Sequence, residues 1–305
     1  MQSRFPTAVG VFMILAFWSI PCFQASETES LWIDNLDIAK SKALHANADL
    51  MICFTVRDWS AVCRRFEEHF LQQPEFIDPL KSDFVFVHYD LSTEEEDSPG
   101  SQLRDRFEIS GYPTVVLANA QGMPYAFTGF RPDSAKKYAE HLQLLRSENK
   151  KRLKHLSAAA DLSGLERAQH LANALPDLGD HRTAKFYGDI MREVIDLDTE
   201  DSTGKRDGYR FELADFSYVQ EMRRLDEEYQ WMKMVELTNE HIENLDLTGS
   251  RKQAALMNRF DIHRRQGDVR AMVGTLQEVL EVNPYNPHGR QASQILQSLA
   301  SQLQL

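Results

Sequence analysis

Residues 55–65, TVRDWSAVCRR, contain the side chains best suited to chemistry. Cys63 follows Trp59 by four positions, and Ser60 stands three positions before Cys63. Two cysteines at that spacing could exchange a disulfide with a partner, the first attacking as a thiolate and the second resolving the mixed disulfide. An alcohol cannot form a mixed disulfide, so Cys63 is left as a lone candidate thiol. Ser60 is then either a helix N-cap, where serine is preferred, or a nucleophile with no base legible nearby.

The other cysteines allow one further arrangement. Cys22 lies in the apolar N-terminal segment, which leaves Cys53 and Cys63 in the rest of the chain. We consider a buried disulfide between these two, which needs Cα atoms within about 7 Å and converging Cβ directions. The alternative is that Cys63 is an inert thiol on the core side of a helix.

Composition excludes several classes of function. The 305 residues are 42% hydrophobic and 26% charged, which is typical of a soluble globular protein large enough for two domains. A net charge of −12 makes nucleic acid an unsuitable partner, because an acidic chain repels phosphate backbones. We find no Gly-rich phosphate loop and no metal-ligand spacing, and therefore predict neither cofactor nor metal. The histidines on predicted elements are interpreted as isolated and structural: His69, His88, His241 and His263.

The N-terminus has the pattern of a signal peptide at residues 1–25. Arg4 precedes an apolar run at 8–23 that is short for a membrane span and is interrupted by Pro21. We therefore predict an exported, periplasmic or otherwise extracytoplasmic protein. The alternative is an uncleaved anchor, which would be the only membrane contact. Lipid attachment at Cys22 is disfavoured because Pro21 stands where a small residue is expected.

Strand-like and helix-like patterns are mixed between residues 31 and 145. A short apolar run at 49–56 suits a central strand, and the segment at 61–71 has one apolar helical face. The order of elements predicts a central mixed sheet covered by helices. The predicted elements are a helix at 31–46, a strand at 49–56, a helix at 61–71, a strand at 83–91, a helix at 101–109, a hairpin at 114–130 and a helix at 134–145.

From residue 148 only amphipathic helices are predicted. Their turns resemble those of tetratricopeptide repeats, best at 252–284, where Gly267-Asp268 forms the turn and Pro284 the exit. A plain helical bundle is the alternative. The predicted helices are 157–175, 181–196, 206–224, 227–245, 251–266, 269–281 and 287–301, and the predicted division of the chain is 1–25, 26–147 and 148–305.

The motifs of residues 31–145 together resemble a thioredoxin domain of the exported bacterial group. They are, in order, MICFTVRDWSAVC, PEFIDPLKSDFVFVHYDL, ISGYPTVVLANAQG and FTGF. The resemblance implies an α/β thioredoxin fold followed by an all-α helix-hairpin domain. It also implies a substrate groove formed by Trp59, Gly111, Tyr112, Pro113 and Thr114, which would pair with an extended protein or peptide segment.

The resemblance also predicts a cis Tyr112–Pro113 bond, since the cis form is accessible only before proline. Trp59 and Tyr112 could instead be core aromatics. Two departures stand out: Ser60 replaces the attacking cysteine, and Cys53 occupies the place of a buried aspartate. The sequence therefore favours a non-catalytic or weakly redox-active protein-interaction module of the cell envelope, or a purely structural envelope protein. The alternative is a thiol-disulfide oxidoreductase or monothiol carrier using Cys63, with or without Cys53.

Overall fold

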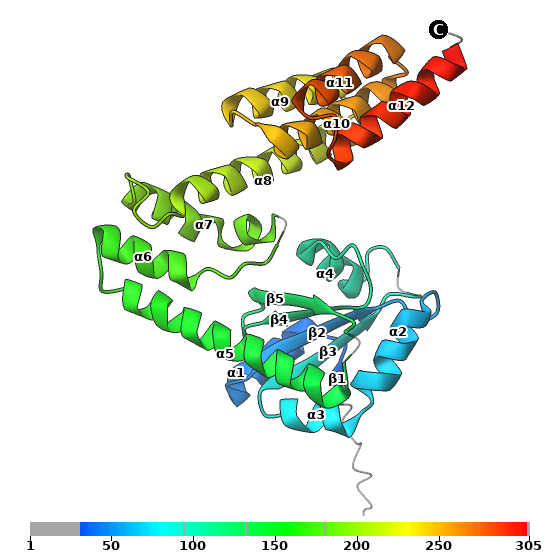
Figure 1. The fold of residues 1–305 in the computed structure, drawn as a ribbon. Coiled ribbons are helices and arrows are strands. Elements are labelled where there is room, and N and C mark those ends of the chain that lie inside the picture. Colours follow the sequence, from blue (N-terminus) through cyan, green and yellow to red (C-terminus); the bar gives the residue numbers. More distant parts are fainter. Residues whose placement is uncertain (1–30, 94, 132, 180, 304–305) are drawn as a thin grey trace, which may run out of the picture. The chain divides into compact units, whose positions relative to one another are not determined.

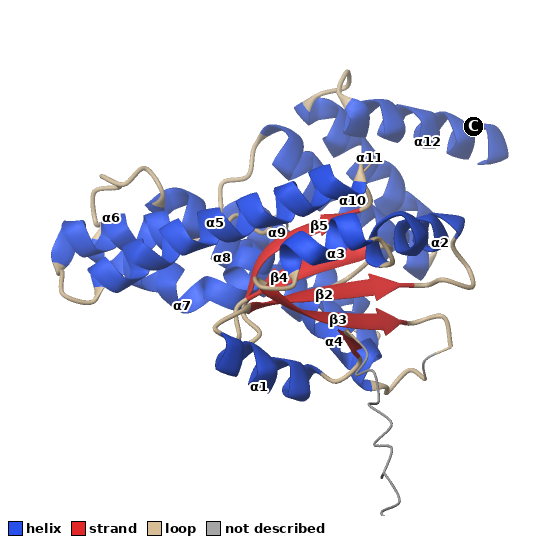
Figure 2. Ribbon diagram, turned by 90° about the horizontal axis from the view of Figure 1, so that it is seen from below, coloured by secondary structure: helices blue, strands red, loops and turns tan. Residues whose placement is uncertain are grey.

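A five-stranded mixed sheet forms the centre of the first half of the chain (Figures 1 and 2). The computed structural model describes residues 31–93, 95–131, 133–179 and 181–303, so the predicted signal peptide lies outside the described residues. The strand order is β1-β3-β2-β4-β5. The strands are β1 (Trp32–Ile33), β2 (Asp49–Thr55), β3 (Phe84–Asp90), β4 (Thr114–Ala118) and β5 (Pro124–Gly129).

Strand β2 lies at the centre of the sheet, between β3 and β4. It pairs in parallel with β3 and antiparallel with β4, so that Cys53 lies opposite His88 on one side and Val115 on the other. Every residue of β2 after Asp49 is buried. A strand covered on both faces reads as a continuous apolar run, which is the pattern at 49–56.

Helices cover both faces of the sheet. One core contains side chains from α2, the following π-helix, α3 and α5, and the other contains side chains from α1 and α4. The predicted helix at 31–46 starts later, because the short strand β1 precedes it. The elements are α1 (Leu36–Ala46), α2 (Ala61–Phe66), the π-helix η1 (Glu67–Leu71), α3 (Pro74–Leu80), α4 (Pro99–Phe107) and α5 (Ala135–Ala159).

The second half is helical, and each helix from α5 to α12 packs against the next in the chain (Figure 1). This arrangement agrees with the predicted all-α region. No helix among the described residues is long and apolar enough to cross a membrane. The helices are α6 (Gly164–Ala174), α7 (Arg182–Leu197), α8 (Arg206–Glu227), α9 (Trp231–Asn244), α10 (Gly249–Gln266), α11 (Val269–Val282) and α12 (Pro287–Leu303).

One helix differs from its prediction. The helix expected at 134–145 continues as the 25-residue α5, which runs across the predicted division at 147/148. The separate helix expected at 157–175 is accordingly the end of α5 followed by α6. The physical reason is that residues 146–159 contain neither glycine nor proline, so nothing in the backbone ends the helix there.

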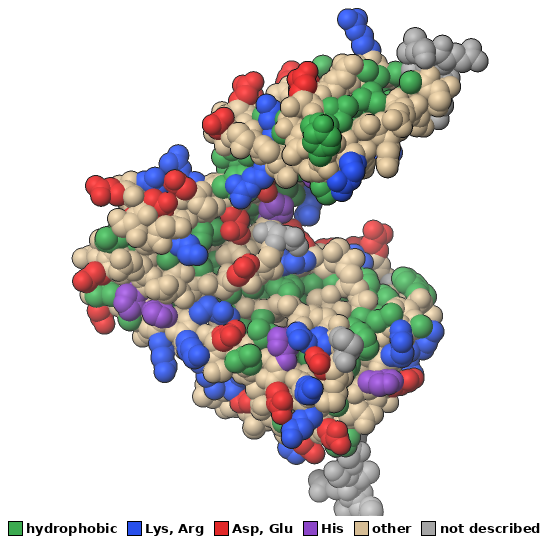
Figure 3. Space-filling model, in the orientation of Figure 1, with side chains coloured by type: hydrophobic (Ala, Val, Ile, Leu, Met, Phe, Trp, Pro, Cys, Tyr) green, Lys and Arg blue, Asp and Glu red, His purple; other side chains and the backbone are tan. Residues whose placement is uncertain are grey.

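Acidic and basic side chains are interspersed over the face drawn in Figure 3, with hydrophobic side chains between them. On this face, no single sign of charge forms a continuous field, although the whole chain is acidic.

Candidate functional site

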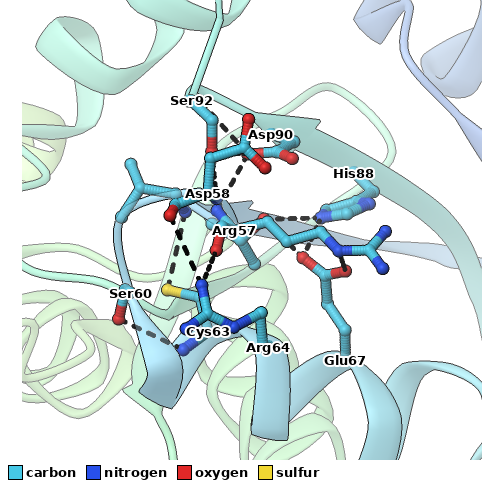
Figure 4. A network of polar contacts seen from close by, with 11 residues as sticks. Arg57, Asp58, Ser60, Cys63, Arg64, Glu67, His88, Asp90 and Ser92 are labelled. Atoms are coloured by element: carbon cyan, nitrogen blue, oxygen red, sulfur yellow. Dashed lines mark hydrogen bonds and ion pairs between the residues drawn. The ribbon is translucent and has the colours of Figure 1, made fainter.

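Ser60 begins α2 as its N-cap. Its backbone is extended (φ −126°, ψ 113°), and its Oγ accepts a hydrogen bond from the backbone N–H of Cys63 at 3.2 Å (Figure 4). This is the capping geometry expected for serine at a helix start, and it satisfies one of the free N–H groups of the first turn. The predicted capping contact is therefore present in the structure.

Cys63 is completely buried. Its Sγ accepts a hydrogen bond from the backbone N–H of Val56 at 3.5 Å. The side chain belongs to the core that includes Phe54, and Tyr112 packs against this core. The fold thus brings Ser60, Cys63 and Tyr112 into one region, but it leaves the sulfur without surface from which to attack a partner.

Cys53 is also completely buried, and both cysteines are free thiols. The disulfide considered from the sequence is therefore not formed. The reason lies in the alternation of β2: Cys53 and Phe54 point to opposite faces of the sheet, and Cys63 packs in the core of Phe54 whereas Cys53 packs in the other core. Burial, and secondarily the charge of Glu67, raises the pKa of the Cys53 thiol well above its usual range.

The loop before β4 has the predicted geometry. The Tyr112–Pro113 peptide bond is cis. Thr114 fixes the loop by donating from Oγ1 to the carbonyl of Gly111 at 2.7 Å. Gly129 of the neighbouring strand is required by close approach, because a Cβ there would lie 2.8 Å from the carbonyl oxygen of Pro113. Gly129, the glycine of FTGF on the strand paired with β4, therefore leaves the space that the cis-proline loop occupies.

The two aromatic residues of the predicted groove differ in their environment. Trp59 is 73% exposed, so the interpretation of this residue as a core aromatic is wrong. Tyr112 is half-buried, and burial raises the pKa of its phenol. An exposed tryptophan directly before the helix start is available for contact with a partner.

Hydrogen bonds to a second loop fix the residues just before Trp59. The backbone N–H of Asp58 donates to Ser92 Oγ at 2.9 Å, and that of Arg57 donates to Asp90 Oδ1 at 3.1 Å (Figure 4). Ser92 Oγ in turn donates to Asp90 Oδ1 at 2.7 Å. Burial acts to raise the pKa of Asp90, but these hydrogen bonds outweigh it and lower the pKa.

A buried acid that sequence reasoning missed lies beneath α2. Glu67, in η1, is 5% exposed, and its Oε1 accepts from Thr55 Oγ1 at 2.9 Å. Nε2 of His88 lies 2.9 Å from the same hydroxyl and 3.8 Å from Oε1 (Figure 4). The guanidinium Nε of Arg57 approaches Oε2 to 3.6 Å. With the Thr55 proton directed at Glu67, the hydroxyl oxygen accepts from His88, which fits a neutral imidazole protonated on Nε2.

Burial is the main influence on both titratable groups of this network. It raises the pKa of Glu67 and lowers that of His88. The inference that the buried acid is lost with Cys53 therefore needs correction, because a carboxyl is present on the helix instead of the strand. Its position four residues after Cys63, between Phe66 and Phe70, was the signal available in the sequence.

His241 is not isolated either. Its Nε2 lies 3.0 Å from Asp215 Oδ1, and Nδ1 of His181 lies 3.3 Å from Asp215 Oδ2. In the described part of the chain, no group of three or more His, Cys, Asp or Glu side chains is arranged to hold a metal ion.

The mixed sheet between two helical layers, the helix that starts at Ser60 and the cis-proline loop beside it define a thioredoxin-like fold. Residues 36–145 match the family model described as a thioredoxin-like domain, and this part of the chain is a thioredoxin-like domain. The match ends at residue 145, within α5.

Two curated relatives are from Chlamydia pneumoniae. The chain is 22% identical over 227 residues to the thioredoxin-related protein DsbJ, covering 70% of this chain and 61% of the relative. It is 24% identical over 101 residues to the disulfide bond reductase DsbH, covering 31% of this chain and 60% of the relative. The chain thus spans about six-tenths of the length of each. A solved structure named DsbH oxidoreductase is 20% identical, with a TM-score of 0.35 and coverage of 37% of this chain and 82% of that one.

Proposed function

We propose that this protein is an exported, non-catalytic thioredoxin-like module that binds protein or peptide segments. One observation carries the proposal: Ser60 occupies the attacking position as a helix cap, while Cys63 behind it is fully buried. A thiol without accessible surface cannot serve as an attacking nucleophile. The disulfide reductase activity in the name of DsbH belongs to a relative, and this chain lacks the first sulfur that such a reaction needs.

Two features beside the buried sulfur support a surface for a partner. The cis-proline loop is held by Thr114 and by the close approach of Gly129, and Trp59 is exposed beside the helix start. An extended segment could add its main chain to such a loop edge, with side-chain contacts to the tryptophan. The helices α6 to α12, whose turns resemble those of tetratricopeptide repeats best at 252–284, would provide a second protein-binding surface.

Export rests on the apolar segment at 8–23. The prediction is that the protein is recovered outside the cytoplasm and begins near residue 26. Fractionation followed by N-terminal sequencing tests it, and recovery of the full-length chain in the cytoplasm would contradict it.

The alternative is thiol chemistry through Cys63, and one variant separates the two proposals. Ser60→Cys would place a second sulfur at the start of α2, three residues before Cys63. In an insulin-reduction assay with dithiothreitol as final reductant, we expect no turnover above background for the native protein and clear turnover for the variant. Ser60→Cys combined with Cys63→Ser is the matched control and should lose the gain. Native turnover that Ser60→Cys does not increase, and that Cys63→Ser abolishes, would establish the alternative.

A further inference from the structure

A cavity of about 340 Å³ in the helical region is lined by both charged and apolar side chains. It lies among α8, α9, α10 and the residue that precedes α7. Its volume is that of a site for a small organic molecule. The lining residues are His181, Phe211, Asp215, Tyr218, Val219, His241, Leu247, Arg251, Ala254, Ala255 and Asn258.

The acid of this cavity is already paired. Asp215 has an imidazole nitrogen beside each carboxylate oxygen: Nδ1 of His181 at 3.3 Å and Nε2 of His241 at 3.0 Å. The His241 ring is also held from its face, stacked on Tyr218 with ring centroids 4.1 Å apart and planes 11° apart. Among the lining residues that the structure describes, Asp215 is the only acid.

Arg251 has a different environment. Its guanidinium carbon lies 4.0 Å from the centroid of the Phe211 ring, a cation–π contact that holds the side chain in place. Within residues 31–303, the positions left undescribed excepted, the structure gives Arg251 no acidic partner and no hydrogen-bond acceptor. A fixed guanidinium whose donors are free is suited to a planar oxyanion, which it can bind through two parallel hydrogen bonds.

The other lining residues indicate the polarity of the rest of the ligand. Val219, Leu247 and the two alanines of α10 give the cavity an apolar side beside the Phe211–Arg251 pair. The hydroxyl of Tyr218 is occupied, since it lies 3.0 Å from Thr238 Oγ1. An apolar body is thus favoured next to a single anionic group.

We propose that this cavity binds a small ligand with one carboxylate or phosphate group, held by Arg251, and an apolar body. The two imidazoles beside Asp215 pair the only acid among the lining residues that the structure describes, which reduces its repulsion of a ligand anion. The site is separate from the cis-proline groove, and the proposal does not depend on the function proposed for that groove.

Titration of the full exported chain with three probes tests the proposal directly. The probes are benzoate, phenyl phosphate and the neutral benzamide, at constant ionic strength, with the imidazole signals of His181 and His241 followed by NMR. We expect saturable shifts with at least one anion and none with benzamide. A preference for benzoate would identify a carboxylate ligand, and a preference for phenyl phosphate a phosphate. Absence of saturable shifts with both anions, or equal shifts with benzamide, would overturn the proposal.

A pair of variants identifies the binding residue. Arg251→Gln should weaken anion binding about tenfold or more, the loss expected for charge-assisted hydrogen bonds. Arg270→Gln removes the same charge from an exposed position on α11 and should leave binding unchanged. Unchanged binding in Arg251→Gln would overturn the assignment. If thermal unfolding shows that this variant is not folded, Arg251→Lys, which keeps the charge and loses the planar fork, should still weaken binding relative to Arg270→Gln.

Discussion

The groove and the sulfur site of the thioredoxin-like domain lie next to each other but have different properties. In the groove, the backbone has the full geometry of the fold: a cis bond before Pro113, a loop closed by Thr114 and a glycine where Pro113 approaches. At the sulfur site, Ser60 caps a helix and Cys63 is enclosed in the core. The cis-proline loop therefore depends on packing and backbone geometry and keeps its conformation with a serine at residue 60.

The acid beneath the helix refines this comparison. Cys53 stands on β2 where the resemblance implies a carboxyl, whereas Glu67 provides a buried carboxyl from η1 and accepts a hydrogen bond from Thr55. The domain therefore contains a buried carboxyl, although residue 60 is a serine. A change from serine to cysteine is the smallest step that would restore a dithiol.

Among the variants of the groove, the helix cap and the buried carboxyl, Gly129→Ala is expected to have the largest effect on stability. Gly129→Ala should lower the free energy of unfolding by about 1–3 kcal/mol, because its Cβ would meet the Pro113 carbonyl and the sheet would have to shift. Gly111→Ala is the matched control: no atom lies within 4 Å of its added Cβ, so a change within about 0.5 kcal/mol is expected. Urea denaturation of the two variants measures the difference. Equal effects would mean that the close approach does not hold the loop.

At the sulfur site, removing the Ser60 side chain should cost no more stability than removing another serine N-cap. Ser60→Ala should cost about 1 kcal/mol, the usual value for removing a serine N-cap. Ser134→Ala removes the corresponding contact at the start of α5, where Oγ accepts from Lys137 at 3.3 Å, and should cost a similar amount. A much larger loss at Ser60, seen in denaturant unfolding, would indicate a role beyond capping.

The buried carboxyl should be visible in the pH dependence of stability. Burial raises the pKa of Glu67, so the folded state keeps its proton to a higher pH than the unfolded chain does. The resulting stabilisation is complete below the ordinary carboxyl pKa and is lost as the pH rises through the raised value. As the pH rises through the raised pKa of Glu67, the free energy of unfolding of the native protein should therefore fall relative to that of Glu67→Gln.

The control for this prediction is a substitution of the next residue, Glu68. Glu68 is exposed, and Glu68→Gln should show no such trend against the native protein. Unfolding free energies from urea titrations at several pH values provide the measurement. A flat difference for Glu67→Gln would show that Glu67 does not titrate with a raised pKa.

The smallest effect on stability is expected at the exposed edge of the groove. Trp59→Ala should change the free energy of unfolding by less than about 0.5 kcal/mol, because the side chain is 73% exposed. Phe66→Ala, at a fully buried position of α2, should cost about 3–5 kcal/mol in the same experiment. A large loss at Trp59 would mean that this residue serves the core instead of a partner.

Local patterns in the sequence predicted most of the fold, because short segments determine the backbone geometry of individual strands, helix starts and turns. The apolar run of β2, the serine before α2 and the Tyr112–Pro113 pair each specify backbone geometry within a few residues, and each has the predicted geometry. The helix predicted to end at 145 instead continues to Ala159, because no glycine or proline interrupts residues 146–159.

The polar contacts could not be predicted in the same way, because their partners come from different elements. Glu67 meets Thr55 and His88 across a helix and two strands, and Asp215 meets His181 and His241 from neighbouring helices. A histidine therefore looks isolated in the sequence until the fold provides its acid. The faces to which Cys53 and Cys63 point depend likewise on how α2 packs over β2.

The most direct test of the account measures the reactivity of the two thiols in the native protein. Protein purified without reductant is treated with iodoacetamide, folded or unfolded in urea, and the modified cysteines are identified by peptide mass spectrometry. We expect that Cys53 and Cys63 are both free and both unmodified while the protein is folded, and that both react once it is unfolded. Rapid modification of Cys63 in the folded protein, or a disulfide between the two, would contradict it.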